Sequence, residues 1–323
     1  MKSLFLDLAT ASLVVWGLVH GLLAQQPARG VPLASAEARP VNTTVRGSTA
    51  FRLPWDNSRD QPGQQAGEPS EQAIARHPLF PALQFAGGVA DQIHEHVHDY
   101  TCVLIKRERI EDQLQDFQTM RVRVRCGHVA DDRPAVPFSV FLEFLGPPKV
   151  RGRRVLFVEG ENNNKMLARN GGKRFNYVIV KLDPLSEAAT RESLVPITEM
   201  GLENMTRMLM RLLKENIQHD PSGTNSRLAF YRNAKVNERN CTRISVRHPD
   251  PNPALGFSSA DVYVDDEFHV PIRLEAYAWP VRPSGPSQLL FEYTYEDLHL
   301  NVGLTGADFQ PSLLQSPPSS TQE

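Results

Sequence analysis

The sequence predicts a mainly β protein of the α+β class. We expect one large, curved antiparallel sheet of about 11 strands, a half-barrel, with one or two helices packed on its concave face. Three observations predict this fold. Many short stretches alternate apolar and polar residues with the period of two of half-buried strands. The connections between them are too short for parallel crossovers. Only two segments show the spacing of an amphipathic helix.

The N-terminal residues 1–24 predict export. Lys2 is followed by an almost wholly apolar run from Leu8 to Leu23 and then by Ala24, the pattern of a secretory signal peptide cleaved after Ala24. The alternative is an uncleaved N-terminal anchor, because the run nearly reaches the roughly 20 residues that span a bilayer. Both interpretations place the protein in the periplasm or cell envelope, and the second associates it with the membrane.

The next segment, residues 25–77, is rich in Gln, Pro, Ala, Gly and Ser. It has too few apolar residues to offset the entropy lost on ordering, so we expect a disordered tether. The tail at 310–323 is expected to be disordered for the same reason. Residues 78–309 then form a single β-rich domain, long enough to bury a substantial core.

The two helices follow from apolar stripes. The first runs from Leu83 to His98 and the second from about Glu199 to Ile217, with Thr198 as the expected N-cap. The stripes are Phe85, Val89, Ile93 and Val97 in the first helix, and Leu202, Met205, Leu209 and Leu212 in the second.

The strands follow from alternation. The clearest run is Phe138 to Phe144, and a hairpin is expected where Asp265, Asp266 and Glu267 connect the strand Ala260 to Val264 with the strand Val270 to Ala276. The other strands are expected at Tyr100 to Arg107, Phe117 to Cys126, Arg154 to Glu159, Lys165 to Arg169, Phe175 to Leu182, Leu228 to Lys235, Cys241 to His248 and Leu289 to Leu300. In the last strand the apolar residues change from odd-numbered to even-numbered positions, which predicts a bulge near Glu296 and Asp297.

Composition excludes several classes of protein. Of the 323 residues 41% are hydrophobic and 22% charged, which is typical of a globular protein and not of a fibrous or multi-pass membrane one. With a net charge of -2, the chain lacks the surplus of Lys and Arg that is typical of proteins that bind phosphate groups. We therefore expect no nucleic-acid partner.

The methionine-rich second helix is the candidate ligand site. Methionine side chains adapt to irregular apolar partners, so Met205 and Met208, with Leu209 and Leu212, are expected to line a cavity that accepts acyl chains. The alternative is that these side chains only fill the gap between the helix and a curved sheet.

A second candidate is the H-E-x-x-H pattern at His94-Glu95-His96-Val97-His98. On a helix, His94 and His98 would lie four residues apart on one face and could bind zinc, with Glu95 as the base that activates a metal-bound water in a hydrolase. Two observations argue against it: the helix is expected to end at this point, and the sequence offers no convincing third ligand. We therefore expect no catalytic residues, metal or cofactor, and retain the zinc hydrolase as the alternative.

The three cysteines, Cys102, Cys126 and Cys241, are disulfide candidates in an exported protein. If the hairpin that contains the first two turns around Leu114, Cys102 faces Cys126. An equally reasonable bridge joins Cys102 to Cys241 and leaves Cys126 free. The sequence does not decide between them.

Several segments together resemble a known family. They are Tyr100 to Arg109, Pro137 to Phe144, Val155 to Gly160, Pro196 to Glu199 with Gly201, His248-Pro249, and Asn301 to Leu304 with Asp308-Phe309. Their order and spacing resemble the bacterial, planctomycete-type family of domains of unknown function DUF1571, from about Ile93 to Phe309. That family is similar in organisation to the LolA/LolB-like and RseB-like periplasmic proteins, whose antiparallel sheet curls around helices to make an apolar cavity for lipoprotein acyl chains.

The resemblance also suggests a structural polar network at one end of the sheet, formed by Arg107, Glu108, Glu159 and Glu199. With export and the methionine-rich helix, it implies a non-catalytic binding protein of the cell envelope. The expected partner is a lipid or a lipidated protein. The alternatives are the zinc hydrolase and an envelope scaffold without a small ligand.

Overall fold

The computed structural model describes residues 70–130, 133–171, 177–282 and 284–315. All of them belong to one compact unit within Gly47–Glu323. The predicted signal segment and the predicted tether up to residue 69 lie outside the described residues, so their predictions are not tested.

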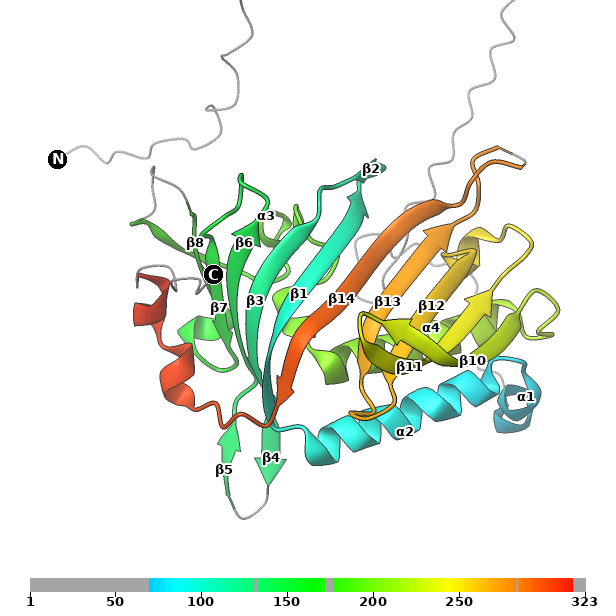
Figure 1. Cartoon of the computed structure of the whole chain (residues 1–323), viewed down its shortest axis with the longest axis horizontal. Helices are drawn as coiled ribbons and strands as arrows, with labels where there is room; N and C mark the ends of the chain where they lie inside the picture. Colours follow the sequence, from blue (N-terminus) through cyan, green and yellow to red (C-terminus); the bar gives the residue numbers. More distant parts are fainter. Residues whose placement is uncertain (1–69, 131–132, 172–176, 283, 316–323) are drawn as a thin grey trace, which may run out of the picture. The chain divides into compact units, whose positions relative to one another are not determined.

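The unit is built on one open antiparallel sheet of 12 strands, in the order β10-β11-β12-β13-β14-β1-β3-β6-β7-β8-β9, with β2 paired to β1 (Figure 1). Every predicted strand is confirmed. A separate hairpin of β4 (His128–Ala130) and β5 (Arg133–Val136) was not predicted. The strands of the sheet are β1 Asp99–Ile110, β2 Gln113–Leu114, β3 Gln118–Arg125, β6 Ser139–Gly146, β7 Arg154–Val158, β8 Met166–Arg169, β9 Ile179–Leu182, β10 Arg227–Val236, β11 Arg239–Arg247, β12 Ser259–Asp265, β13 Pro271–Ala278 and β14 Gln288–Leu300.

The predicted bulge is also present in β14. Its pairing with β1 shifts between Thr101 and Val103, whose partners are His299 and Glu296, and Asp297 between those partners has a φ of 48°. The extra residue lets both ends of β14 keep their apolar side chains on the buried face.

Four α-helices accompany the sheet in the described residues: α1 Glu71–Arg76, α2 Phe80–His96, α3 Glu187–Thr190 and α4 Leu202–His219. The two long ones, α2 and α4, pack against each other and lie along one side of the sheet (Figure 1). The two predicted long helices are therefore confirmed, and their apolar stripes are buried against the inner, concave face of the sheet.

The start of α4 differs from the prediction. Its N-cap is Gly201, with a φ of 113°, and not Thr198. The residues Ile197–Glu199 form the separate 3-10 turn η3, and the backbone turns through Gly201 into the helix. The hydroxyl of Tyr100 accepts a hydrogen bond from the amide of Leu202 at 3.1 Å, so the sheet itself caps the first helical N–H.

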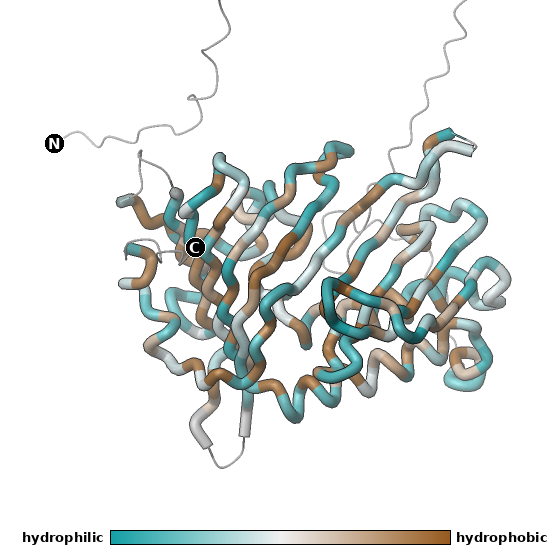
Figure 2. The backbone as a smooth tube through the Cα atoms, viewed as in Figure 1, coloured by the Kyte–Doolittle hydropathy of each residue, from teal (hydrophilic) through white to brown (hydrophobic). Residues whose placement is uncertain are grey.

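The inner face carries the main core. Along β1 the even-numbered residues Tyr100, Cys102 and Leu104 are buried among apolar neighbours, as are Met120, Val122 and Val124 on β3. Figure 2 shows hydrophobic stretches along the strands of the sheet. The alternation that predicted the strands therefore also identifies which side chains face the helices.

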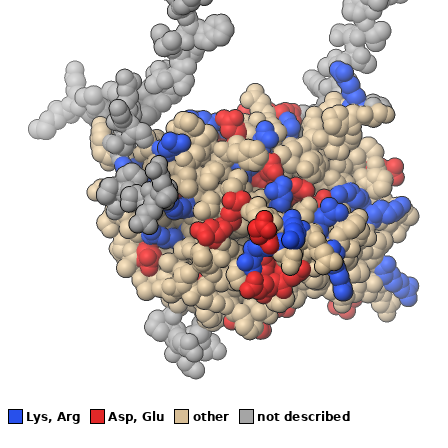
Figure 3. All heavy atoms as spheres, in the orientation of Figure 1, with Lys and Arg blue, Asp and Glu red and all other residues tan. Residues whose placement is uncertain are grey.

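The outer face of the sheet is divided. Over β10 to β14 it is polar, with ion pairs between neighbouring strands such as Arg247–Asp261 at 2.8 Å and Arg273–Glu292 at 3.1 Å. Figure 3, viewed from this side, shows basic and acidic side chains interspersed. Over β6 to β8 it carries a second apolar cluster. The strands of that half are buried on both faces, which is why β7 is buried at every position.

The second cluster corrects the first part of the predicted disordered tail, whereas residues 316–323 lie outside the described residues. Residues Gly306–Phe309 (η5) and Pro311–Leu314 (η6) form 3-10 turns on this outer face, and Leu314 is 0% exposed. Arg154 donates to the carbonyl of Leu313 at 2.8 Å. The boundary predicted at residue 309 is therefore wrong, because the apolar outer face of β6 to β8 needs a cover that a short segment can supply.

The N-terminal boundary of the domain is also earlier than predicted. The helix α1 and His77, which is 4% exposed, lie within the segment predicted to be a tether. His77 Nε2 donates to the carbonyl of Asp220 at 2.8 Å, and its Nδ1 accepts the amide of Leu79 at 3.1 Å. These two bonds fix the start of α2 against the end of α4.

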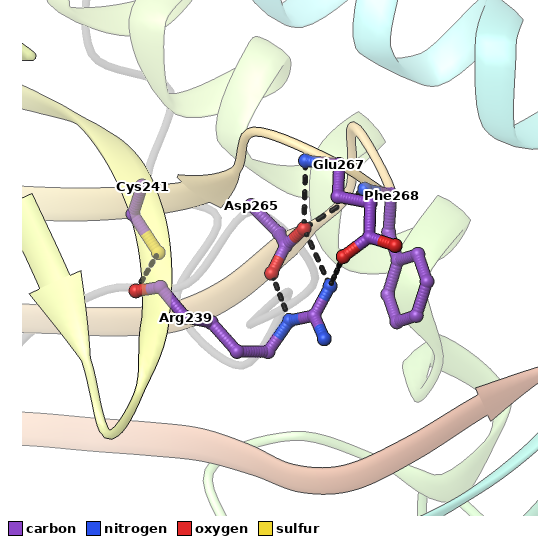
Figure 4. Close-up of polar contacts among 5 residues, drawn as sticks. All are labelled: Arg239, Cys241, Asp265, Glu267 and Phe268. Atoms are coloured by element: carbon purple, nitrogen blue, oxygen red, sulfur yellow. Dashed lines mark hydrogen bonds and ion pairs between the residues drawn. The ribbon is translucent and has the colours of Figure 1, made fainter. Parts of the chain in front are cut away.

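The predicted tight connection between β12 and β13 is confirmed (Figure 4). Asp265 is 1% exposed and accepts hydrogen bonds from the amides of Glu267 at 2.9 Å and Phe268 at 2.8 Å. The guanidinium of Arg239 also donates to it, at 3.0 Å from Nη2, and lies 4.0 Å over the ring of Phe268. Burial raises the pKa of Asp265, but these hydrogen bonds outweigh it and hold the pKa below its usual value. The cluster fixes the turn.

The predicted Cys102–Cys126 bridge is not formed. The partner of Cys102 across the hairpin is Val122, because the chain reverses at Glu111 and Asp112, which both have positive φ. The turn lies earlier than Leu114, so Cys126, just beyond the end of β3, is four residues past the residue opposite Cys102.

The alternative Cys102–Cys241 bridge is not formed either. Cys241 lies on β11, and β12, β13 and β14 separate that strand from β1. A disulfide needs its two Cα atoms within about 7 Å, less than the width of two strand spacings. All three cysteines are free, and burial raises the pKa of each thiol.

Replacing Leu314 by Ala tests the C-terminal cover. Because this side chain is fully buried in the outer cluster, Leu314→Ala should lower the free energy of unfolding by about 2–5 kcal/mol. Urea denaturation measures the change. The control Leu185→Ala, at a side chain that is 66% exposed, should change it by less than about 0.5 kcal/mol. Equal stability of both variants would contradict the described fold of the C-terminal segment.

Candidate ligand-binding site

A cavity of about 290 Å³ lies on the inner face of the half of the sheet formed by β3 and β6 to β9. We call it the sheet cavity. Its size is close to the lower limit of the roughly 300–1,000 Å³ of small-molecule sites. Its floor is apolar because the inward side chains of these strands are aliphatic or aromatic, among them Met120, Leu142, Phe144, Val155, Met166 and Leu182.

The cover of the sheet cavity is the segment 183–200, which contains α3 and η3. Glu192 on this segment pairs with Arg153 at 2.6 Å, but both side chains are partly exposed and such a pair contributes little. Ser193 accepts a hydrogen bond from Lys106 Nζ at 2.7 Å. The cover is therefore short and irregular, held by packing and a few polar contacts.

A buried polar cluster lies at the edge of this cavity. Lys106 and Glu108 on β1 form an ion pair of 2.8 Å, and their side chains are 9% and 3% exposed. Both point to the inner face because they are two residues apart on one strand. Tyr293 on β14 donates to Glu108 at 2.6 Å. Burial and the charge of Glu108 raise the pKa of Tyr293 well above its usual value, so it stays a neutral donor.

The residues predicted to line a ligand cavity lie on two separate cavities. Met205 and Met208 line a cavity of about 40 Å³ that also contains Lys106, Glu108 and Tyr293. Leu209 and Leu212 line a mainly apolar space of about 60 Å³ between α2, α4 and β11 to β14. Whether any of the four contacts a ligand stays a prediction. The larger sheet cavity, under a different segment of the chain, was not predicted.

The four residues suggested as a polar network are not brought together. Of the four, Glu108 belongs to the buried cluster. Arg107, its neighbour on the strand, points to the opposite face because side chains alternate along a strand. The other three have separate partners. These are the carbonyl of Gln115 for Arg107 at 3.1 Å, the amide of Phe138 for Glu159 at 3.4 Å, and the guanidinium of Arg211 for Glu199 at 2.9 Å.

The structure does not place the two histidines of the H-E-x-x-H pattern on one helix. Helix α2 ends at His96, so His94 and His98 do not lie on one helical face. His94 Nδ1 lies 3.1 Å from Glu203, whereas the backbone amide of His98 donates to Asn301 at 2.8 Å. Across the part of the chain that the structure describes, no group of three or more His, Cys, Asp or Glu side chains could hold a metal ion.

The sequence carries a signal for the polar cluster on β1. On β1 the even-numbered residues 100, 102 and 104 are apolar or aromatic, and the next two on the same face are Lys106 and Glu108. Charged residues on the buried face of a strand are unusual and mark either a paired cluster or a site. Ser193 and Tyr293 lie 87 and 185 residues away from their partners in the chain, and sequence spacing could not have found them.

A second buried polar group surrounds His248 at the end of β11. The side-chain amide of Asn216 on α4 donates to its Nε2 at 3.3 Å, and its Nδ1 donates to the carbonyl of Asn225 at 3.0 Å. Burial lowers the pKa of His248 and outweighs the opposing effect of the Asn225 carbonyl. The neutral ring therefore joins α4, the following loop and β11, which is a structural role.

With the site described, comparison with known proteins gives the family. A sequence model of the family "Protein of unknown function (DUF1571)" matches residues 97–316, so the chain belongs to DUF1571. This confirms the resemblance seen in the sequence. No curated protein sequence matches the chain.

Solved structures give remote similarities. A DUF1329 family protein from Desulfovibrio piger is 14% identical, with a TM-score of 0.36, covering 74% of this chain and 100% of that one. A LolA superfamily protein from Nitrosomonas europaea is 11% identical, with a TM-score of 0.32, covering 71% and 98%. The lipoprotein LppX from Mycobacterium tuberculosis is 13% identical, with a TM-score of 0.37, covering 70% and 98%. At these low scores, any statement about a ligand has to rest on the cavities of this chain.

The neutral state of His248 predicts a pH dependence of stability. Its pKa is lowered in the folded protein, so the unfolded chain binds a proton more readily as the pH falls through the ordinary value of about 6.5. The free energy of unfolding should therefore fall between about pH 7.5 and pH 5. Asp220 and His77 face the same ring, with opposite effects on its pKa.

Urea unfolding at the two pH values measures this difference. His248→Gln should be less stable at the higher pH and should show a smaller decrease on acidification. The matched variant His299→Gln, at an exposed histidine, should keep the decrease of the original protein. An unchanged pH dependence in His248→Gln would show that other groups cause it.

Proposed function

We propose that this protein is a non-catalytic binding protein that holds the acyl chain of a lipid, or of a lipidated protein, against the inner face of its sheet. The observation that carries this proposal is the sheet cavity, with its apolar floor on the strands and its short cover from residues 183–200. An apolar space of this kind binds by removing hydrocarbon from water.

The shape of the space favours a flexible chain. The sheet cavity and the 40 Å³ cavity have Lys106, Ser193, Val195 and Met200 in common, so they adjoin beneath the cover. Methionines line both of them and adapt to irregular apolar partners. A compact polar metabolite would require many converging polar groups, whereas the floor here is mainly aliphatic.

Exposed apolar side chains on the edge strand β9 and just before it support entry of the ligand from an apolar environment. Val180 lines the cavity and is 43% exposed, and its neighbours Tyr177 and Val178 are 75% and 39% exposed. Leu185, at the start of the cover, is 66% exposed. Clustered apolar side chains on a surface are typical of interaction sites. A lipid surface or a lipidated partner would meet these residues first.

The proposed location is the periplasm or cell envelope. It rests on the N-terminal sequence, in which residues 1–24 have the pattern of a signal peptide or anchor, followed by a polar tether. Within the described ranges, no helix combines the length and the apolar character needed to cross a membrane.

Filling the cavity tests the proposed function. Ala168 on β8 lines the sheet cavity, and in Ala168→Phe the added ring would occupy space proposed for the acyl chain. Mass spectrometry of organic extracts from the natively purified protein should find lipid in the original protein and several-fold less in this variant. The change in unfolding free energy should stay below about 1.5 kcal/mol, because the ring enters existing space.

A matched control separates binding from folding. Ala229 lies on the edge strand β10, away from the sheet cavity, and Ala229→Phe should retain the lipid. If the original protein is empty after native purification and binds no added lipid, the proposal fails and the envelope scaffold becomes the better interpretation.

A further inference from the structure

We infer that Lys106 and Gln118 form a binding site for the carbonyl group of an acyl ester or acyl amide, so that the ligand is an acylated molecule and not a free fatty acid. This inference rests on the proposed function, since it places the polar end of the acyl chain. The two residues lie directly opposite each other on β1 and β3, and both line the sheet cavity.

The ammonium group of Lys106 has one donor left for a ligand. Of its three N–H groups, one is bound by Glu108 at 2.8 Å and one by Ser193 at 2.7 Å. Among the described residues no third acceptor is within hydrogen-bond distance. The side chain is 9% exposed and borders both adjoining cavities, so an acceptor for the third N–H has to come from the content of the cavity.

Gln118 is an independent observation that points to the same place. It is 8% exposed and lines the sheet cavity, and its side-chain amide has no hydrogen-bond partner among the described residues. Among the described residues, the fully enclosed side-chain atoms without a partner are Arg125 Nε, Arg243 Nε and Asp261 Oδ1, so the amide of Gln118 opens to the cavity and bonds to what the cavity holds. Two N–H donors on adjacent strands that open to one cavity are placed to bind one oxygen atom together.

The net charge of the Lys106–Glu108 cluster favours a neutral carbonyl oxygen over a carboxylate. Lys106 and Glu108 are a salt bridge whose charges cancel, and the donor from Tyr293 is neutral. A carboxylate placed here would add an uncompensated negative charge close to Glu108 in a medium of low dielectric constant, which is costly. An ester or amide carbonyl accepts the same two hydrogen bonds without bringing a charge.

The remaining cations around the cavity do not change this balance. Arg153 is paired with Glu192 at 2.6 Å, and Arg191 is paired with Glu187 at 3.7 Å with both side chains largely exposed. Neither supplies a buried, unpaired positive charge for a carboxylate. The carbonyl would therefore lie at Lys106 and Gln118, and its hydrocarbon chain on the apolar floor beyond them.

Displacement of the fluorescent probe N-phenyl-1-naphthylamine from the full chain tests the inference. The competitors are methyl decanoate, decyl methyl ether, which has no carbonyl, and decanoate at about pH 8, where it is charged. Methyl decanoate should displace the probe at roughly tenfold to hundredfold lower concentration than the ether, the effect of a hydrogen bond to a charged donor. Decanoate should bind less tightly than the ester.

Substitutions at Gln118 and Lys106 test whether these two residues bind the carbonyl group. Gln118→Leu and Lys106→Met should weaken methyl decanoate until it binds like the ether, and should leave the ether unchanged. Lys106→Met leaves Glu108 without its cation, so Lys106→Met/Glu108→Gln repeats the test with a neutral pair. The controls Gln113→Leu and Lys149→Met, at residues outside the cavity, should bind as the original protein does.

The outcomes separate this inference from the proposed function. Equal binding of ester and ether, tighter binding of decanoate, or parallel loss of both ligands in Gln118→Leu would overturn the carbonyl site while chain binding stands. If no competitor binds and the probe does not bind either, the proposed function itself fails.

Discussion

The structure depends on one constraint, which is that the apolar inner face of a 12-stranded open sheet has to be covered. The two halves are covered differently. Over β11 to β13 the long amphipathic helices α2 and α4 leave about 60 Å³ of free space. Over β3 and β6 to β9 the short, irregular segment 183–200 leaves about 290 Å³. The sheet cavity is thus a consequence of unequal cover.

The same half of the sheet is buried on its outer face by η5 and η6. Strands β6 to β8 are therefore supported from behind while they form the floor of the cavity. A cavity whose floor is packed on the far side can keep its shape when its cover moves. The polar outer face of β10 to β14 needs no such support, since helices fill the inner face there.

The polar cluster is a place where the inner face departs from apolar packing beside the sheet cavity. A buried pair such as Lys106–Glu108 is often no more stabilising than apolar side chains of the same size, because both charges lose their hydration. It lies at the junction of two cavities, opposite Gln118 on the neighbouring strand. In the function that we propose, the cluster orients the bound chain.

The sequence by itself determined the strands, both long helices, the bulge at Asp297 and the turn at Asp265, because each depends on local periodicity or turn chemistry. The features that depend on contacts between residues far apart in the chain were decided only by the tertiary structure. The register of β1 and β3, set by two residues with positive φ, separates Cys102 from Cys126. The cover of the sheet cavity and the partners of Lys106 come from segments far along the chain, and no spacing in the sequence encodes which segments meet.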